Sequence, residues 1–551
     1  MLAEDLLHKH RRQSNNPEAP YNDEIYNQAL CIIEDKVTLM GGQPLEVYGL
    51  PKPQHGSEER LAKEYFREVD YNQEELAAQV HDLQNNLTED QREVFIAFLN
   101  MVQEHEYNNN NDAEKRILFL DAPGGKGKTY LINLLLAKIR SEGKIVLATA
   151  SSGIAATLLQ GGRTLHSTFK VPLDCHRKDT PSCNIKRNSA MAKVIQDCKA
   201  IIVDEAPMTH KSVFEALDRS LRDIIGVQKI FGGIPTLLCG DFRQILPVVK
   251  NGTRANIVNA SLKTSYLWNN VIIKKLTTNM RAHLSDNTGG DEFAKLLIDI
   301  GDGKFPLTTS PDVITIPQEL GECVQSLEDL KAKVYPNLTT NATSQEWLGE
   351  RAIISPLNSS ENQLNIWLMS EFPGEGREYK SIDTAINDGE AVQYPVEFLN
   401  SLELAGLPPH KLTLKPGCPI MVLRSLEPPK TMNGTRCIVT RLHENVIEAM
   451  ISTGPFKNET VILPRIPLVP SDSEIPFQFR RLQFPVKPCF AFTINKAQGQ
   501  TLKAIGIDLS SDCFTHGMFY VSVSRTGNGN NLYIKASNKR TRNVVYHEAL
   551  Q

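Results

Sequence analysis

The sequence is poor in cysteine and lacks long apolar runs. Its 551 residues include 10 cysteines in no regular framework, which argues against a disulfide-bonded secreted scaffold and fits reduced thiols in an intracellular protein. No uninterrupted apolar run approaches the roughly 20 residues that a membrane helix needs. Residues 1–15 contain no apolar stretch of the kind found in secretory signals. We therefore expect no membrane partner.

Neither sign of charge dominates the chain. With 60 Lys and Arg against 64 Asp and Glu, the net charge neither indicates nor excludes a nucleic-acid partner. The distribution is uneven, because residues 1–86 hold 8 basic and 16 acidic side chains and the remainder holds 52 and 48. A content of 41% hydrophobic and 23% charged residues excludes a disordered or collagen-like chain.

The order of sequence patterns predicts an α/β protein with several domains. Residues 1–86 read as an α-helical accessory or linker segment to which we assign no chemical role. From residue 116 onward, short apolar runs alternate with helical patterns, which predicts parallel sheets with right-handed crossovers. We expect a first such domain over 87–285 and a second over 286–551. Many Pro and Gly and several short β-type runs predict a small β-barrel-like insertion at about 415–485.

A glycine-rich loop follows the first apolar run. Ile117–Leu120 leads into Asp121–Thr129 and then into a helix with one apolar face, which is the context of a phosphate-binding P-loop. Lys128 should reach the β- and γ-phosphates of ATP, and the Thr129 hydroxyl should ligate Mg²⁺. Ala122 replaces the first glycine of the pattern, and it should fit unless φ is positive there. The residues expected to contact the nucleotide are Gly124, Gly125, Lys126, Gly127, Lys128 and Thr129.

Two carboxylates end a later apolar run. Asp204 and Glu205 follow Ala200–Val203, and we expect Asp204 to hold Mg²⁺ and Glu205 to act as the base that orients the attacking water. A third run, 236–239, places Gln244 at the same carboxyl edge of the sheet, where ligands bind in open α/β folds. Gln244 could contact the γ-phosphate there.

The order of these motifs resembles the PIF (petite integration frequency) family of DNA helicases, in the 5′-to-3′ branch of superfamily one. The likeness covers most of residues 87–551 and is greatest to the helicase portion of Helitron transposon proteins. It adds segments that are similar to family motifs: 87–91 with Gln91 as adenine reader, 149–153 and 162–169 as single-strand contacts, 214–222, 276–281, 433–436 inside the β insertion, 492–501 and 520–525.

The resemblance implies two RecA-like motor domains with ATP between them. Arg281 and Arg525 would then be arginine fingers on the γ-phosphate, and Gly499 would join the nucleotide contacts. Lys126 stands where the family often has Thr, and it could either add charge near the phosphates or point to solvent. The single-strand candidates are Thr149, His166, Phe169, Thr493 and Lys496.

Two of these candidates keep an alternative. Phe169 could be a core residue instead, and His166 could be a structural histidine. Residues 172–188 are polar and basic, and the resemblance puts a strand-separating wedge there; a solvated loop is the alternative. Cys175, His176 and Cys183 are candidate zinc ligands, although their spacing fits no standard ligand pair.

The implied function is an ATP-dependent DNA helicase that moves 5′ to 3′ on single-stranded DNA and unwinds duplex junctions in transposition, recombination, repair, or telomere and genome maintenance. We expect a monomeric motor, nuclear by resemblance, with a mitochondrial location left open. A translocase that does not unwind, an RNA- or hybrid-directed motor, and a DNA-binding transposon relic without ATPase activity are the alternatives. No His-apolar-His nuclease motif occurs, so strand nicking is not expected, and the chain could be a stand-alone helicase or part of a transposon polyprotein.

Overall fold

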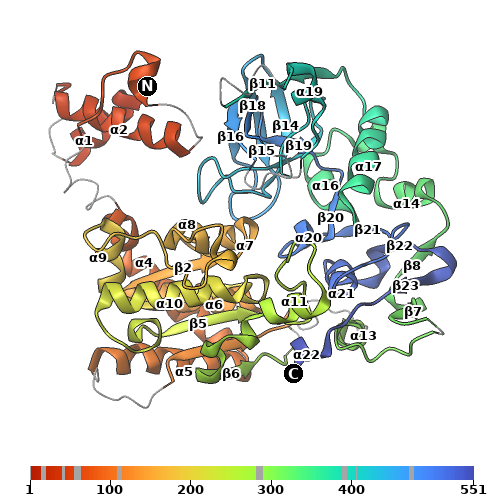
Figure 1. Cartoon of the computed structure of the whole chain (residues 1–551), viewed down its shortest axis with the longest axis horizontal. Helices are drawn as coiled ribbons and strands as arrows, with labels where there is room; N and C mark the ends of the chain where they lie inside the picture. The colour runs from red at the N-terminus through yellow and green to blue at the C-terminus, as the bar shows by residue number, and fades with distance from the viewer. Residues whose placement is uncertain are drawn as a thin grey trace.

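The structure is a computed structural model that describes residues 2–13, 20–39, 44–54, 64–107, 115–278, 280, 290–308, 310–386, 394–404, 406–470 and 477–551. Figure 1 shows two sheet-containing domains, with a β insertion above the second. None of the helices within these ranges is long and apolar enough to cross a membrane. The fold class expected from the sequence, two RecA-like domains with a β insertion, is confirmed.

The first domain is built on a parallel sheet of strand order β3-β2-β4-β5-β1-β6. Its central strands are buried on both faces, as in parallel sheets covered by helices. Ile117 and Phe119 enter the core on one face, and Leu118 and Leu120 enter the core on the other. The strands are β1 (Ile117–Asp121), β2 (Ile145–Ala150), β3 (Arg163–Thr164), β4 (Cys198–Asp204), β5 (Thr236–Gly240) and β6 (Val271–Lys275).

Helices cover both faces of this sheet. Leu76 and Val80 of α4 are buried in the same core as Leu118 and Leu120, so the boundary expected at residue 86 cuts through a packed unit. The amphipathic α4 follows the Gly and Pro breaks at 41–53 that suggested a separate segment. The helices are α4 (Gln73–Leu83), α5 (Glu89–Tyr107), α6 (Lys128–Ser141), α7 (Gly153–Thr157), α8 (Leu165–Phe169), α9 (Ala190–Asp197), α10 (Lys211–Ile225) and α11 (Arg254–Ala260).

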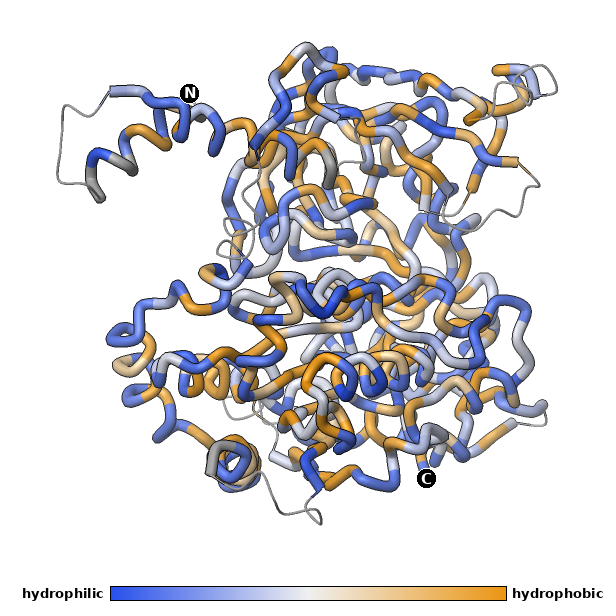
Figure 2. The backbone as a smooth tube through the Cα atoms, turned by 60° about the vertical axis from the view of Figure 1, so that its left-hand side comes forward, coloured by the Kyte–Doolittle hydropathy of each residue, from blue (hydrophilic) through white to orange (hydrophobic). Residues whose placement is uncertain are grey.

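The N-terminal helices lie apart from this packing. α1 (Leu2–Gln13) and α2 (Asp23–Leu39) contact each other. Figure 1 shows them standing away from both sheet domains, and the N-terminus projects to one side of the molecule in Figure 2. The helical character expected for residues 1–86 is thus present in α1, α2 and α4.

The second domain repeats the parallel arrangement. Its main sheet has the order β20-β9-β21-β22-β8, and an antiparallel pair β23-β7 stands beside it. The strands are β7 (Val313–Thr315), β8 (Glu322–Val324), β9 (Arg351–Ser355), β20 (Ala491–Thr493), β21 (Ala504–Asp508), β22 (Leu532–Lys535) and β23 (Arg540–Arg542). The helices are α13 (Gly290–Gly301), α14 (Leu327–Val334), α15 (Leu338–Asn341), α16 (Gln345–Gly349), α17 (Asn358–Glu371), α20 (Ile494–Ala497), α21 (Met518–Val523) and α22 (His547–Leu550).

The β insertion is antiparallel and longer than the sequence suggested. It begins at β10 rather than near residue 415, because β10 and β11 are short polar strands without an apolar run. Its sheets have the orders β16-β15-β14-β13-β19, β11-β18-β17 and β10-β12. The elements are β10 (Arg377–Lys380), β11 (Ile382–Ala385), α19 (Val396–Ser401), β12 (Lys411–Leu414), β13 (Pro419–Val422), β14 (Arg436–Leu442), β15 (Val446–Ile451), β16 (Thr460–Pro464), β17 (Ile466–Leu468), β18 (Phe479–Gln483) and β19 (Val486–Pro488).

A fully buried ion pair ties this insertion together. Asp383 of β11 lies opposite Arg481 of β18, and their side chains pair at 2.7 Å with no exposed surface on either. Arg481 also donates to the backbone carbonyls of Leu399, Leu402 and Pro408. Because buried charges are tolerated only when they are paired and hydrogen-bonded, this residue pair fixes β11, β18 and the α19 region relative to one another.

Candidate functional site

The phosphate loop joins β1 to α6. Gly125 and Gly127 adopt the left-handed region, with φ of 86° and 77°, which glycine reaches without the steric cost of a Cβ. Ala122 is not among the residues with positive φ, and its backbone N–H donates to the Gly240 carbonyl at 3.0 Å. Alanine therefore fits at this position. α6 begins at Lys128, so its N-terminal amides face the loop.

Lys128 meets both predicted carboxylates at the carboxyl edge of the sheet. Its Nζ lies 2.7 Å from Asp204 Oδ1 and 2.7 Å from Glu205 Oε1. Although burial acts against the charged lysine, these two carboxylates raise the pKa of Lys128 above its ordinary value. The structure thus assembles three residues predicted from separate motifs into one charged cluster.

Glu205 occupies a strained backbone conformation. Its φ of 52° lies in the left-handed region, which is uncommon for a residue with a Cβ and collects at functional sites. Its N–H donates to Asp204 Oδ1 at 2.8 Å. This turn directs the two neighbouring carboxylates toward the same lysine.

The atoms around Lys128 fit a nucleotide with Mg²⁺. Thr129 offers a hydroxyl beside the lysine and Asp204 offers a carboxylate, which are the oxygen ligands that Mg²⁺ prefers. The positive φ at Gly125 and Gly127 turns the loop backbone into a cradle of amides of the kind that binds anions. Thr129 and Asp204 are therefore the residues that would hold the metal.

Gln91 holds the phosphate loop from the side. It is 1% exposed, and its amide Nε2 donates to the Lys126 carbonyl at 3.1 Å while its Oε1 accepts from the Thr88 N–H at 3.1 Å. The Lys126 side chain does not point to solvent, since its Nζ donates to the Thr277 carbonyl at 2.7 Å. Burial lowers the pKa of Lys126. The solvent alternative for Lys126 is wrong because the chain after β6 passes directly over the loop, and the addition of charge near the phosphates stays a prediction.

Asp90 is a residue that the sequence reasoning did not single out. Its Oδ2 accepts from the N–H groups of Thr277 and Thr278 at 2.7 and 3.0 Å. Burial alone would raise the pKa of Asp90, but hydrogen bonds from Thr88, Thr278, Thr277 and Gln91 hold it well below its usual range. The residue therefore fixes the segment that precedes Arg281, which itself lies outside the described residues.

Gln244 lies at the junction with the second domain. It is 4% exposed, and its Oε1 accepts from Gln498 Nε2 at 2.9 Å. In the same segment, Asp241 accepts from the Tyr520 hydroxyl at 2.7 Å. His516 bridges the Phe242 carbonyl and the Tyr546 N–H, and burial lowers its pKa to about 4, so it stays neutral. These hydrogen bonds join the segment that directly follows β5 to α21 and to the residues around α21.

Arg525 and Gly499 lie in the second domain near this junction. The Arg525 guanidinium donates to the Val521 carbonyl at 2.8 Å and to Ser524 Oγ at 2.7 Å, and it is 6% exposed. Gly499 has φ of 79° and faces Ile154 of α7. Their contacts with the nucleotide stay predictions.

Two of the single-strand candidates are core residues. Thr149 is fully buried, and its hydroxyl donates to the Ile202 carbonyl of β4 at 2.9 Å. Phe169 is fully buried in the core that also holds Phe119. Neither side chain can reach a bound strand, so both predictions are wrong, and the core alternative for Phe169 is confirmed. Short motifs do not reveal which face of a buried strand or helix a side chain takes.

The other single-strand candidates, His166, Thr493 and Lys496, differ in how far their side chains are exposed. His166 is half-buried, and burial lowers its pKa, so both expectations for it remain. Thr493 is 8% exposed and stands at the N-terminus of α20. Lys496 of α20 is half-buried. Their contacts with a strand remain predictions.

The excursion at 172–188 is anchored in the first-domain core. Cys175 and Cys183 are buried there, and burial raises the pKa of both thiols, that of Cys183 to about 11. Such thiols resist the deprotonation that zinc binding requires. Across the described residues, no three His, Cys, Asp or Glu side chains gather as a metal site. The zinc alternative is therefore unsupported, and the wedge stays a prediction.

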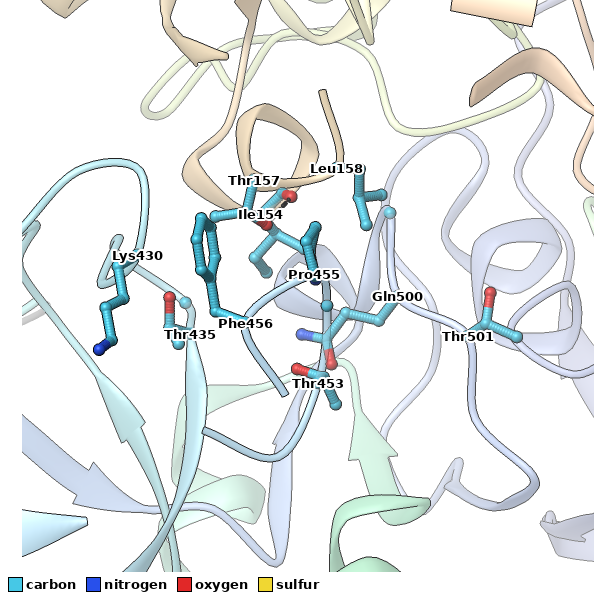
Figure 3. A pocket seen from close by; sticks show the side chains of 13 residues that line it. Ile154, Thr157, Leu158, Lys430, Thr435, Thr453, Pro455, Phe456, Gln500 and Thr501 are labelled. Atoms are coloured by element: carbon cyan, nitrogen blue, oxygen red, sulfur yellow. Dashed lines mark hydrogen bonds between the residues drawn. The ribbon is translucent and has the colours of Figure 1, made fainter. Parts of the chain in front are cut away.

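A cavity of about 200 Å³ lies where α7, the β insertion and the segment after α20 meet. Figure 3 shows Ile154 and Leu158 facing Pro455 and Phe456 of the β15–β16 loop, with Gln500 in the wall. The start of α7 touches the insertion so closely that a Cβ on Gly153 would lie 2.6 Å from the Asn433 carbonyl oxygen. The predicted contact motif 149–153 thus borders a space shared by all three parts.

Comparison with known proteins agrees with this arrangement. Residues 86–311 match the model of the PIF1-like helicase, and residues 397–442 match the 2B domain of DNA helicase Pif1. Over these two segments the chain resembles the PIF1-like helicase family. Within the family, the ATP-dependent DNA helicase PIF1 of Xenopus laevis is 25% identical over 422 residues, which cover 75% of this chain and 58% of that protein. The ATP-dependent DNA helicase Pif1 of Bdellovibrio bacteriovorus is 24% identical over 431 residues, covering 77% and 85%.

Solved structures of the family share the fold. Bacteroides Pif1 bound to single-stranded DNA has a TM-score of 0.59 and 23% identity, covering 84% of this chain and 95% of that one. Pif1 helicase from Candida albicans has a TM-score of 0.59 and 21% identity, covering 84% and 98%. The chain spans just over half the length of the first curated relatives it matches. The narrower likeness to Helitron proteins stays a prediction.

The left-handed backbone conformation of Gly127 predicts a loss of stability when this glycine is replaced. We expect Gly127→Ala to destabilise the first domain by about 1–2 kcal/mol, because an L-residue is strained in this conformation, and its Cβ would lie 2.4 Å from Gln91 Nε2. Hydrogen exchange of amides in β1 and α6 of the nucleotide-free protein measures this. Gly124→Ala is the matched control, since Gly124 has open space around its Cβ position and no positive φ. Equal stability of the two variants would contradict the argument.

Proposed function

We propose that this chain is an ATP-dependent DNA helicase that moves 5′ to 3′ along single-stranded DNA and unwinds duplex at junctions. The observation that carries the proposal is the cluster of Lys128, Asp204 and Glu205 at the carboxyl edge of the first sheet. This cluster supplies a cation for phosphate, a carboxylate for Mg²⁺ and a carboxylate for the attacking water.

The geometry supports a separate role in ATP hydrolysis for each of these residues. Lys128 would exchange its carboxylate partners for the β- and γ-phosphate oxygens of ATP. Glu205 would accept the proton of the water that attacks the γ-phosphate. Thr129 and Asp204 would hold Mg²⁺, which would supply positive charge for the phosphate oxygens. Arg281 and Arg525 would add positive charge as the domains close, since a cation at the developing charge lowers the barrier.

Domain contacts at the same edge support the coupling of hydrolysis to movement. Gln244 is joined to Gln498, and Asp241 to Tyr520, so the strand ends beside the ATP site are hydrogen-bonded to the second domain. A change at the phosphate would alter how firmly the two domains hold together, and two domains with alternating grip on a strand advance along it. The proposal includes a monomeric motor and a nuclear location, both from the family resemblance.

Steady-state ATP hydrolysis with and without single-stranded DNA tests the proposal, with Lys128→Ala beside it. We expect strong stimulation by DNA that the variant loses. Forked duplexes with only a 5′ or only a 3′ tail then test polarity, and we expect unwinding with the 5′ tail. DNA-stimulated hydrolysis without strand separation would favour the translocase. DNA binding without hydrolysis above the variant would favour the relic.

A further inference from the structure

A second lysine lies next to the strand candidate Lys496, at the carboxyl edge of the second parallel sheet. β20 and β9 pair in parallel with Thr493 opposite Ser355, so both strands end at the same place. Lys496 follows β20 within α20, and Glu361 follows β9 within the first turns of α17. Lys487 of β19 reaches this place from the β insertion and forms an ion pair with Glu361. Ligands of open α/β sheets bind at such edges.

The charges of this cluster do not balance. Two ammonium groups face one carboxylate, and across the described residues no carboxylate forms an ion pair with Lys496. Burial and the neighbouring Lys487 lower the pKa of Lys496 to about 8. Two like charges held together in a partly desolvated place favour an anion between them. The arrangement is thus one negative charge short.

The cluster is open on the lysine side. The Glu361 side chain has no exposed surface, whereas that of Lys487 is 16% exposed. Glu361 Oε2 is buried and has no hydrogen-bond partner within the described part of the chain. The carboxylate therefore lies behind Lys487 and holds it from the protein side, and the ammonium can still reach a ligand at the surface.

We propose that Lys487 and Lys496 together bind one phosphodiester of the single strand, with Glu361 as the positioning residue for Lys487. The proposal rests on the proposed function, because it takes the strand to run past Thr493 and Lys496. It extends the strand site from the second domain onto β19 of the β insertion. Movement of the insertion relative to the second sheet would then open or close this phosphate site, since the two lysines come from different parts.

The salt dependence of single-strand binding tests this. Each lost phosphate contact lowers the slope of log K against log salt by about 0.7 for single strands. We expect Lys487→Gln to lower the slope by about that amount and to weaken binding several-fold at low salt. Because this variant leaves Glu361 buried without its cation, the double variant Glu361→Gln/Lys487→Gln is measured as well, and it should show the same loss of slope. Lys457→Gln is the matched control, since Lys457 pairs with Glu346 at 2.9 Å on the exposed surface.

The possible results separate this proposal from the proposed function. A wild-type chain that binds no single strand would contradict the proposed function itself. Wild-type binding with an unchanged slope in the folded double variant would overturn the phosphate site alone. A shift of ATP affinity in place of the salt slope would assign the lysine pair to the nucleotide and would also overturn it. A loss of slope equal to that of Lys457→Gln would mean that any surface lysine has this effect.

Discussion

Glu205→Gln is expected to reduce ATP hydrolysis by about two to four orders of magnitude, the usual contribution of a general base, while ATP binding is retained. Glutamine keeps the size of the side chain and one oxygen for Lys128 Nζ, which lies 2.7 Å from Glu205 Oε1 in the wild type. It cannot accept a proton from water. Lys128 keeps its second partner, Asp204, at 2.7 Å, so the phosphate loop should hold its shape. Steady-state hydrolysis with single-stranded DNA and titration of a fluorescent ATP analogue measure the two effects.

A control separates chemistry from general loss of charge. Glu346→Gln removes a carboxylate that also pairs with a lysine, Lys457, but lies on the surface. It should hydrolyse ATP at the wild-type rate. If Glu205→Gln lost less than ten-fold, the base would have to be another group. If ATP binding fell together with hydrolysis, Glu205 would support the loop instead of the water.

Local motifs were sufficient to predict the ATP site. The apolar run 117–120 became β1, extended by Asp121, and the run 200–203 became β4, extended at both ends. Parallel strands bring their carboxyl ends to one edge, and so Lys128, Asp204 and Glu205 meet although they come from distant parts of the chain. Chemistry that depends on strand ends can be read from sequence, because the strand, the loop and the helix are all local patterns.

Properties that depend on packing between distant segments were not predictable in this way. The burial of Phe169 and Thr149 depends on helices that cover the sheet. The contact of Gln244 with Gln498 joins residues 254 positions apart. Lys126 bonds to Thr277 because the chain after β6 crosses the loop. No local spacing encodes such contacts, whose formation depends on the tertiary fold.

The start of the β insertion shows the same limit at the level of elements. β10 and β11 show no regular alternation of apolar and polar residues, and they pair with strands far along the chain. A half-buried strand of this kind gives a weak pattern over four residues. Asp383 in β11 is charged and nevertheless buried. The ion pair with Arg481 explains why this carboxylate is buried.

The buried ion pair of Asp383 and Arg481 leads to a prediction of a large loss of stability. Asp383→Ala is expected to destabilise the β insertion by about 3–5 kcal/mol, because removal of one partner leaves the other charge buried and uncompensated. The Arg481 side chain has no exposed surface, and it donates to the Asp383 carboxylate from Nε at 3.1 Å and from Nη2 at 2.7 Å. Since a chain of several domains does not unfold in one step, hydrogen exchange of amides in β11 and β18 is the suitable measurement. It should accelerate by about two to four orders of magnitude, at 1.36 kcal/mol per ten-fold.

Removal of both charges should not restore stability here. Buried ion pairs can often be replaced by apolar residues at little cost, but Arg481 also donates to three backbone carbonyls, those of Leu399, Leu402 and Pro408. Asp383→Leu/Arg481→Met would leave these carbonyls without their donor in the interior, and each such group is costly. We therefore expect the double variant to exchange as fast as Asp383→Ala or faster. Asp223→Ala, which breaks an exposed pair with Arg187, should leave exchange in β11 and β18 unchanged. Wild-type protection in the double variant would mean that the charges, and not the carbonyl bonds, decide the stability of the insertion.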